Sequence, residues 1–251
     1  MKLGAEIRLK AGKERSLRRR HPWVYDTAVA SVKGRPQCGD TVAVLSHDGQ
    51  WLAWAAYAPD SSLRARCWSF CQGDTIDADW FAAKLRAAVA RRRILEADTN
   101  ALRLVFGEAD GLPGFVADRY ADQLVVQLQS AGAWAQRDVL IEALSAATDC
   151  PHVFERSDSA ARAREGLAPA SGLIAGTEPA LRIEVHEQGI RYFVDVYQGH
   201  KTGFYIDQRD NRHRLAQLVA QWSAAHGEAP RVLNCFCYTG GFSLAAARGL
   251  G

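Results

Sequence analysis

The segment Pro230–Ala247 has the residue order of a small-molecule binding site: an apolar run, then two glycines, then the start of a helix. Arg231–Phe236 predicts a β-strand, and Ser243–Ala247 predicts the first turns of a helix. Gly240 and Gly241 carry no Cβ, so they allow a tight turn and a close approach of a ligand to the backbone. A strand, a glycine turn and a helix open the nucleotide-type sites of α/β proteins.

The spacing within this segment leaves a plainer interpretation open. It does not read G-x-G-x-x-G, and no G-K-[ST] follows, as a P-loop requires. On spacing alone, an ordinary strand–turn–helix explains the segment as well as a cofactor site does. The preceding residues, Asp207–Arg212, are charged or polar and lead into a helix predicted from Asn211 to about Ala225. There, helix capping and salt bridges are the alternative to contact with a ligand.

A second group of residues that could do chemistry is basic and lies near the N-terminus. Six of the twelve residues from Lys10 to His21 are Lys or Arg, and His21–Tyr25 adds aromatic side chains. Residues 1–76 hold 12 Lys or Arg against 7 Asp or Glu, whereas residues 77–251 hold 19 against 21. This asymmetry indicates contact with a polyanion. A solvated basic helix explains the same segment equally well.

Basic side chains interleaved with aromatic ones suit phosphate contact and base stacking. For Trp23 the more ordinary role is core packing, and for Arg64 and Arg66 the alternative is a place on a β face. The predicted RNA contacts are therefore the remaining basic residues of the segment: Lys10, Lys13, Arg15, Arg18, Arg19 and Arg20.

Composition excludes several classes of protein. The chain has 251 residues, of which 48% are hydrophobic and 24% charged, as in ordinary globular proteins. No apolar run reaches the length of a membrane span, and the first residues lack the apolar run of a signal peptide, so a cytoplasmic protein without a membrane partner is expected. The six cysteines form no zinc pattern with a second half, which predicts free, buried thiols and no metal site.

The elements that must position these residues follow from turn and periodicity signals. Short β runs at 41–45, 51–57 and 63–70, separated by turn residues, predict a small barrel that ends near residues 73–74. A helix is predicted over 79–97, with Asp77 or Asp79 as its cap. At its C-terminal end, Arg91–Arg93 would complement the helix dipole.

The middle of the chain reads as a mixed α+β unit. Glycines mark tight turns over 107–114, and strands are predicted at 122–129 and 152–155, with a helix over 134–147 between them. The stretch 157–180 is rich in small residues and is expected to be mostly loop. Two alternating runs flank Glu187–Gly189 and predict a β-hairpin.

Several segments give the chain a resemblance to a known family. The most specific are K-T-G-F-Y-I-D-Q-R at Lys201–Arg209 and V-L-N-C-F-C-Y-T-G-G-F-S at Val232–Ser243. The others are Arg18–Tyr25, Asp60–Arg66, Gly107–Phe115 and Glu165–Leu167. With them, essentially the whole chain resembles the bacterial large-subunit ribosomal RNA methyltransferases that carry an N-terminal PUA domain. That family makes 5-methylcytosine in 23S rRNA with S-adenosyl-L-methionine.

The resemblance implies a multidomain protein with an RNA partner, 23S ribosomal RNA, and it allows a homodimer. Residues 1–76 would form a PUA-like RNA-binding β-barrel, residues 77–190 a central α+β domain, and residues 191–251 the beginning of a Rossmann-like α/β methyltransferase domain. The cofactor would be S-adenosyl-L-methionine. Its expected binding residues are Asp207, Gln208, Arg209, Arg212, Asn234, Phe236, Tyr238, Gly240 and Gly241.

The sequence departs from the family's pattern in its catalytic part. The resemblance implies an Asp-Pro-Pro segment and a nucleophilic cysteine, which are expected beyond Gly251, so no catalytic residue is assigned. Cytosine C5 needs a thiolate to add at C6 before it can attack a methyl sulfonium. Cys235 and Cys237 lie in the cofactor strand and loop, on the wrong side of the methyl group for that attack.

We therefore expect a chain truncated after the first cofactor motif and inactive by itself. The strand at Arg231–Phe236 would lack sheet partners, so residues beyond about 228 are expected to be poorly packed or paired with another chain. The alternative function is a non-catalytic RNA-binding module with an incomplete cofactor site. A generic nucleotide-binding α/β protein is a third interpretation, which the basic and aromatic N-terminal segment disfavours.

Overall fold

The computed structural model describes residues 4–158 and 160–250, without the side chain of residue 161. By its internal contacts the chain divides into two compact units. The first holds residues 1–93, 103–118 and 122–179, and the second holds residues 94–102, 119–121 and 180–251. The domain boundaries expected at residues 76 and 190 stay predictions. Among the described residues, no helix is long and apolar enough to cross a membrane.

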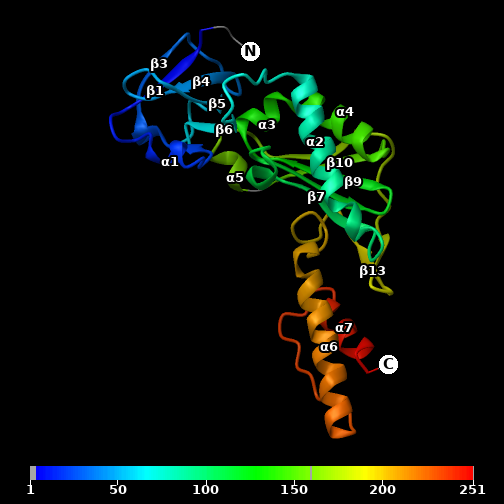
Figure 1. The fold of residues 1–251 in the computed structure, drawn as a ribbon. Helices are drawn as coiled ribbons and strands as arrows, with labels where there is room; N and C mark the ends of the chain where they lie inside the picture. Colours follow the sequence, from blue (N-terminus) through cyan, green and yellow to red (C-terminus); the bar gives the residue numbers. More distant parts are fainter. Residues whose placement is uncertain (1–3, 159, 251) are drawn as a thin grey trace. The chain divides into compact units, whose positions relative to one another are not determined.

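The N-terminal part of the first unit is built on a six-stranded sheet (Figure 1). Its strands run in the order β2-β6-β5-β4-β1-β3, with β1 and β4 parallel. Buried side chains from these strands and Leu17 form one hydrophobic cluster. The short strands predicted here are confirmed, since alternating apolar residues can line a core on one face. The elements are β1 Glu6–Leu9, α1 Arg15–Arg18, β2 Trp23–Val24, η1 Asp26–Ala28, β3 Val29–Lys33, β4 Thr41–Leu45, β5 Trp51–Tyr57 and β6 Ala65–Ser69.

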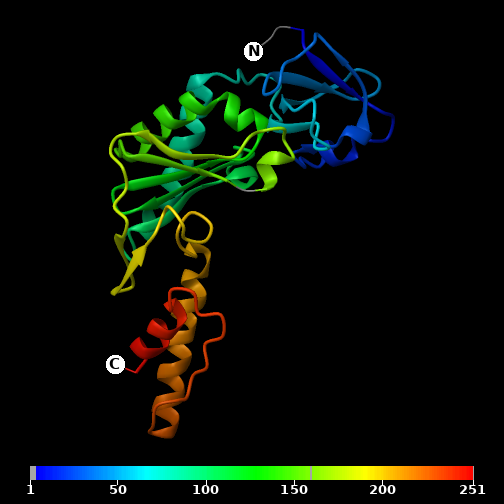
Figure 2. The ribbon, with the colours of Figure 1, turned by 180° about the vertical axis from the view of Figure 1, so that it is seen from behind.

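The rest of the first unit is formed around a five-stranded sheet in the order β11-β10-β9-β8-β7. Helices α2 and α4 pack against each other and lie on one face of this sheet (Figures 1 and 2). Helix α2 begins as predicted, because the Asp77 carboxylate accepts a hydrogen bond from the backbone N–H of Trp80. The elements are α2 Ala78–Arg92, η2 Arg93–Leu95, β7 Ala101–Phe106, η3 Gly107–Asp110, β8 Phe115–Tyr120, β9 Gln123–Leu128, α3 Ala131–Ala135, α4 Arg137–Thr148, β10 Val153–Ser157, α5 Ala160–Ala163 and β11 Ala170–Ala175.

The structure adds to two predictions for this sheet and its helices. Much of the stretch 157–180 is loop, as expected, but it also contains α5 and β11, and β11 pairs antiparallel with the edge of β10 and so satisfies its backbone groups. At the end of α2, Arg91 and Arg92 do more than complement the helix dipole. Both donate to the Asp110 carboxylate, at 2.6 Å and 2.7 Å, and Asp110 is buried.

The second unit contains a β-hairpin, a long helix and a short helix. The predicted hairpin is confirmed, with Gln188 and Gly189 both at positive φ in its turn, as a two-residue type I′ turn requires. Alternate side chains along its first strand are buried. The long helix ends at Gly227, which adopts a left-handed conformation. The elements are β12 Ile183–Glu187, β13 Ile190–Val194, η4 Ile206–Gln208, α6 Arg209–His226 and α7 Gly241–Arg248.

The strand predicted at Arg231–Phe236 is absent from the described structure, where this segment has no regular secondary structure. A strand needs a neighbour to bond its backbone groups, and none lies beside these residues. Leu233 and Phe236 are accordingly almost fully exposed. Poor packing was thus correctly expected for this loop. The same expectation was wrong for α7, because Ala245 and Ala246 are buried and this helix packs on α6.

The cysteines are free thiols, but most are not buried. Cys67 and Cys150 are buried, whereas Cys38, Cys71, Cys235 and Cys237 are exposed. The prediction of buried thiols is therefore wrong for these four. They lie in loops, where the apolar neighbours in the sequence do not enclose them. Among the described residues, no group of three or more His, Cys, Asp or Glu side chains could hold a metal ion.

Candidate functional site

The two most specific sequence segments meet at a cavity of about 340 Å³ in the second unit. One wall comes from the loop that precedes α6 and from the start of that helix, and the other comes from the loop that precedes α7. The volume lies within the range of about 300–1,000 Å³ that is typical of small-molecule sites. Its lining residues are His200, Phe204, Tyr205, Asp207, Gln208, Arg212, Phe236, Cys237, Tyr238, Thr239, Gly241 and Phe242.

Three rings form an aromatic cluster in this cavity. The His200 and Tyr238 rings stack at 4.4 Å between centroids, and the Tyr205 ring meets both of them edge-on. The Tyr238 hydroxyl accepts a hydrogen bond from the His200 backbone N–H at 2.9 Å and donates to the Gly203 carbonyl at 3.2 Å. These contacts join the two loops and present aromatic faces, which attract cations and stack on planar groups.

Asp207 places a negative charge in the same cavity. Its carboxylate accepts hydrogen bonds from Lys201 at 2.7 Å and from Gln208 at 3.3 Å. Burial acts to raise the pKa of Asp207, but the hydrogen bonds and the positive charge of Lys201 outweigh burial and lower the pKa below its ordinary value. The carboxylate is therefore ionised at neutral pH.

A buried ion pair supports the cavity from within the second unit. Arg212 donates from Nε and Nη2 to the two carboxylate oxygens of Glu187, both at 2.7 Å. Its Nη1 donates to the Tyr205 carbonyl at 3.0 Å, and its guanidinium lies 4.6 Å from the Phe204 ring. Both charged side chains are only 4% exposed. The pair thus fixes the end of β12, the start of α6 and the Tyr205 loop in one arrangement.

The glycines of the motif bring helix α7 close to this ion pair. A Cβ built on Gly241 would lie 3.2 Å from Cδ of Arg212 and 3.8 Å from the Tyr192 ring. Gly240 precedes the helix at a φ of +74°. No described side chain caps α7, so its first N–H groups are available to an anion, with the helix dipole behind them.

The predicted cofactor residues divide into two sets. Six line the cavity: Asp207, Gln208, Arg212, Phe236, Tyr238 and Gly241. Three do not: Arg209 donates to Asp210, Asn234 donates to Ser243, and Gly240 is the residue that precedes helix α7. For Arg212 the salt-bridge interpretation describes its observed contacts, although it also lines the cavity.

Sequence reasoning missed half of the lining residues. His200 and Tyr205 are the most consequential, because they complete the aromatic cluster. Tyr205 lies within the family-specific segment Lys201–Arg209, and His200 directly precedes it, so the density of aromatic residues there was the available signal.

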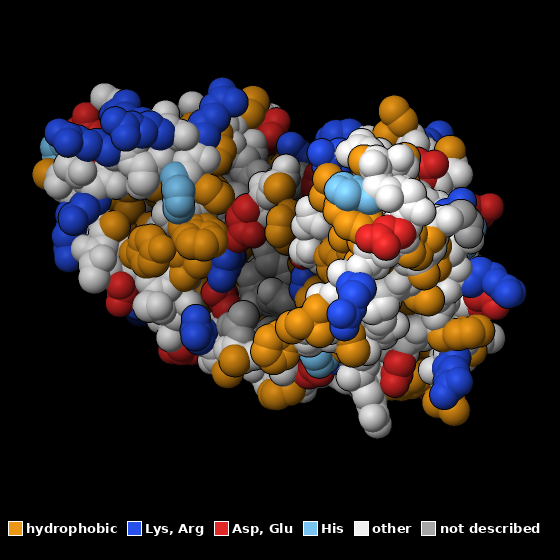
Figure 3. Space-filling model, turned by 90° about the horizontal axis from the view of Figure 1, so that it is seen from below, with side chains coloured by type: hydrophobic (Ala, Val, Ile, Leu, Met, Phe, Trp, Pro, Cys, Tyr) orange, Lys and Arg blue, Asp and Glu red, His pale blue; other side chains and the backbone are white. Residues whose placement is uncertain are grey.

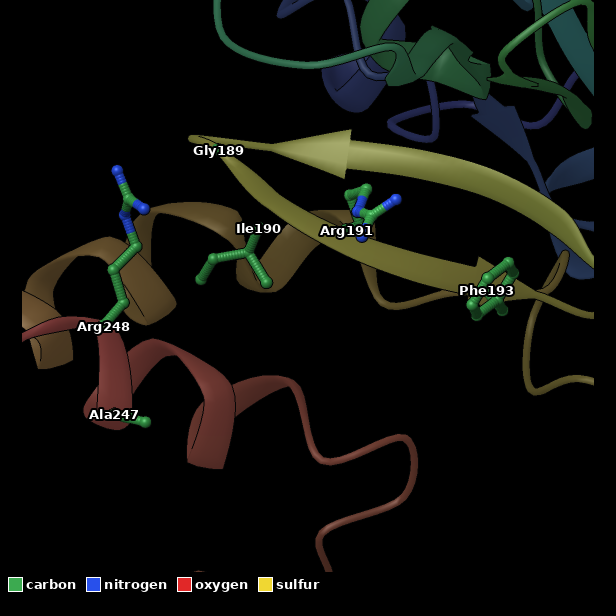
Figure 4. A pocket seen from close by; sticks show the side chains of 6 residues that line it. All are labelled: Gly189, Ile190, Arg191, Phe193, Ala247 and Arg248. Carbon is green, nitrogen blue, oxygen red and sulfur yellow. The ribbon is translucent and has the colours of Figure 1, made fainter.

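A second cavity in the same unit is larger, at about 590 Å³, but it is lined by none of the predicted residues. Figure 4 shows its walls: the hairpin residues Gly189, Ile190, Arg191 and Phe193, and the end of α7. The Arg248 guanidinium extends to the hairpin turn, 3.2 Å from where a Cβ of Gly189 would stand. Volume alone therefore does not identify the cofactor site, and the smaller cavity has the more suitable chemistry.

The six predicted RNA contacts are all exposed side chains of the first unit. They lie within and on either side of a single helical turn, Arg15–Arg18, whose Leu17 enters the core. Lys10 donates to the Thr27 carbonyl and Arg18 donates to Gln50, which orders two of them. On the face in Figure 3, Lys and Arg side chains gather at the upper left, so positive charge is grouped on that face.

Comparison with known proteins finds a family model that matches the N-terminal part and relatives that match nearly the whole chain. Residues 7–70 match the family model of a PUA-like domain. The chain is 48% identical, over 98% of its length, to Ribosomal RNA large subunit methyltransferase I of Shewanella denitrificans, and 46% identical, over 97%, to that of Photobacterium profundum. It spans 61% and 60% of these two relatives, about three fifths of their length.

Solved structures show the same fold. A Streptococcus mutans protein described as a SAM-dependent methyltransferase superposes with a TM-score of 0.77 at 22% identity, over 97% of this chain and 60% of its own. A methyltransferase structure complexed with SAH gives a TM-score of 0.78, also at 22% identity and with the same two coverages. The multidomain architecture expected from the sequence, a PUA-like domain followed by a methyltransferase-type fold, is confirmed.

Proposed function

We infer from the extent and identity of these matches that the chain belongs to the family of the large-subunit ribosomal RNA methyltransferases I. We propose that it acts in the S-adenosylmethionine-dependent methylation of ribosomal RNA. The observation that carries this proposal is the cavity in which the two family-specific segments meet. By resemblance we propose cytosine C5 of 23S rRNA as the target and the cytoplasm as the location.

The residues of the cavity fit this cofactor. S-adenosylmethionine supplies an electrophilic methyl group on a sulfonium cation. Aromatic faces and the ionised Asp207 suit that cation. The uncapped start of α7 suits the carboxylate of the methionine part, because N–H groups there point at an anion. Gly241 keeps the backbone accessible beside Arg212.

We propose a division of labour along the chain. Residues 1–76 would bind RNA through Lys10, Lys13, Arg15 and Arg18–Arg20, and residues 191–251 would carry the cofactor pocket. Residues 77–190, the central α+β domain, would connect these two parts. The exposure of all six basic side chains supports the RNA face. A homodimer stays a prediction that sedimentation can check.

Calorimetric titration of S-adenosylmethionine into the chain tests the cofactor assignment. We expect stoichiometric binding that is lost in Gly241→Val, because the new side chain would meet Arg212 and fill the approach to the backbone. The matched control is Gly73→Val in the other unit, where a Cβ meets nothing within 4 Å. Absence of cofactor binding, with rRNA binding intact, would instead favour a non-catalytic RNA-binding module.

Reversal of Arg18–Arg20 to Glu tests the RNA face. We expect weaker binding to an rRNA transcript and a shallower salt dependence, by about one unit of slope for each lost phosphate contact. Unchanged affinity would refute the assignment of this surface.

A further inference from the structure

Four of the segments that carry the family resemblance lie outside the proposed cofactor pocket and meet in the first unit. Arg66 donates to Glu108 at 2.8 Å and to Glu165 at 3.0 Å. Trp23 donates from its indole N–H to the same Glu108 oxygen at 2.8 Å, and Arg66 lies 5.7 Å from the Trp23 ring. Each of these four residues comes from a different one of the segments Arg18–Tyr25, Asp60–Arg66, Gly107–Phe115 and Glu165–Leu167. Trp23 is held in this network, which favours the packing role over base stacking.

Close backbone contact also holds the two sheets of this unit together. A Cβ on Gly132 in α3 would lie 2.7 Å from the Trp68 ring on β6 and would collide with Ala56 on β5. The network and the helix contact therefore fix the N-terminal sheet against the following α+β part. Any cavity between them has a fixed shape, which is a condition for selective binding.

Such a cavity lies beside the network, with a volume of about 390 Å³. It opens to the surface at Arg20 and Cys71, which are exposed. Its floor comes from β6 and the residue that follows it, and it is apolar except for Ser69. The lining residues are Arg20, Pro22, Cys67, Trp68, Ser69, Phe70, Cys71, Asp74, Lys84, Glu108 and Gly111.

The charges on the cavity walls are of both signs. Arg20 belongs to the proposed RNA face, and Lys84 projects from α2, with its ammonium 4.9 Å from the Trp80 ring. Asp74 and Glu108 supply negative charge to the cavity walls. Among the described residues, the hydrogen bonds to the Glu108 carboxylate, from Trp23 and Arg66, both go to the one oxygen Oε1.

One floor residue carries an unused donor. The Trp68 side chain is 3% exposed, and its indole N–H has no hydrogen-bond partner among the described residues. A buried donor without a partner is costly, so it calls for an explanation such as a bound ligand or an ordered water. The cavity therefore offers cations for a phosphate, carboxylates for amino groups and aromatic side chains for a ring.

We propose that this cavity binds one unstacked nucleotide of the RNA substrate, with Arg20 and Lys84 on its phosphate and its base against Phe70. The proposal rests on the proposed function, since it adds a recognition pocket to the RNA face. An unpaired nucleotide presents an anion, a flat ring and base-edge hydrogen-bonding groups together, which matches the mixed lining.

The exposed thiol of Cys71 reports on the pocket without any mutation. We would measure the alkylation rate of Cys71 by peptide mass spectrometry, with and without an unmodified transcript of large-subunit rRNA. We expect the transcript to slow alkylation of Cys71 at least fivefold. An equal rate at saturating RNA would overturn the proposal.

Charge reversal provides the second measurement. We expect Lys84→Glu to weaken transcript binding about tenfold and to reduce the salt slope by about one unit, and Lys84→Arg to retain most of the affinity. Lys33→Glu is the matched control, because Lys33 is an exposed lysine on β3 outside the cavity. Lys84→Glu with wild-type affinity would overturn the pocket.

The two proposals fail in different ways. If Arg18–Arg20 reversal weakens RNA binding while Cys71 and Lys84 show no effect, the RNA face stands and the pocket falls. If the wild-type chain does not bind the transcript, the proposed function falls first, and the pocket with it.

Discussion

The buried pair of Arg212 and Glu187 gives the sharpest quantitative prediction. Each side chain is 4% exposed, and two hydrogen bonds of 2.7 Å join them. Removal of one partner leaves the other charged and buried, which typically costs about 3–5 kcal/mol. We therefore expect Arg212→Met and Glu187→Leu each to lower the free energy of unfolding by about that amount.

The double variant separates the ion pair from simple packing. Arg212→Met with Glu187→Leu leaves no unpaired charge, so it should lose clearly less stability than the two single variants together. Coupling energies between contacting residues are about 0.5–3 kcal/mol, and we expect a value near the upper end. The remaining cost comes from the Tyr205 carbonyl, which loses its donor.

Urea unfolding followed by tryptophan fluorescence measures these changes, and cofactor titration measures their effect on the cavity. Arg214→Met is the matched control, because Arg214 is an exposed arginine on the same helix. Single variants that cost less than about 1 kcal/mol, or strictly additive losses, would refute the reasoning that the buried pair fixes this unit.

Three further predictions follow from single contacts. Gly132→Ala should destabilise the chain by about 1–3 kcal/mol through overpacking against Trp68, whereas Gly73→Ala should not; equal melting temperatures would contradict this. Burial and the charge of Glu187 raise the pKa of Tyr192 to about 12. The raised pKa stabilises the folded chain at alkaline pH less and less: the contribution of the neutral Tyr192 hydroxyl is fully present below the ordinary pKa of 10 and is lost as pH rises toward 12. Tyr192→Phe should flatten that alkaline loss in unfolding curves, and an unchanged pH dependence would count against it. Because the pKa of Asp207 is lowered, this carboxylate should stay ionised between pH 5 and 8 and cause no change of cofactor affinity with pH. Asp207→Asn should weaken cofactor binding across that range. Calorimetry at several pH values tests both expectations.

Local signals in the sequence predicted the elements that local interactions define. The Asp77 cap and the turn at Gln188–Gly189 depend on residues no more than three positions apart, so both were predictable. The expected strand at Arg231–Phe236 and the missed strand β11 show the limit of such signals. A strand is completed by hydrogen bonds from another segment, and its own residues do not say whether that segment is in place.

The candidate sites show the same division. The sequence by itself determined the residue types of the proposed cofactor pocket, because glycines, aromatic residues and Asp207 lie in two short segments. Tertiary structure decided which of them face one cavity and paired Arg212 with Glu187, 25 residues away. It also brought Arg66 to Glu165 across 99 positions. Burial drives such pairing, since a charge removed from water must find its counter-charge wherever the fold places it.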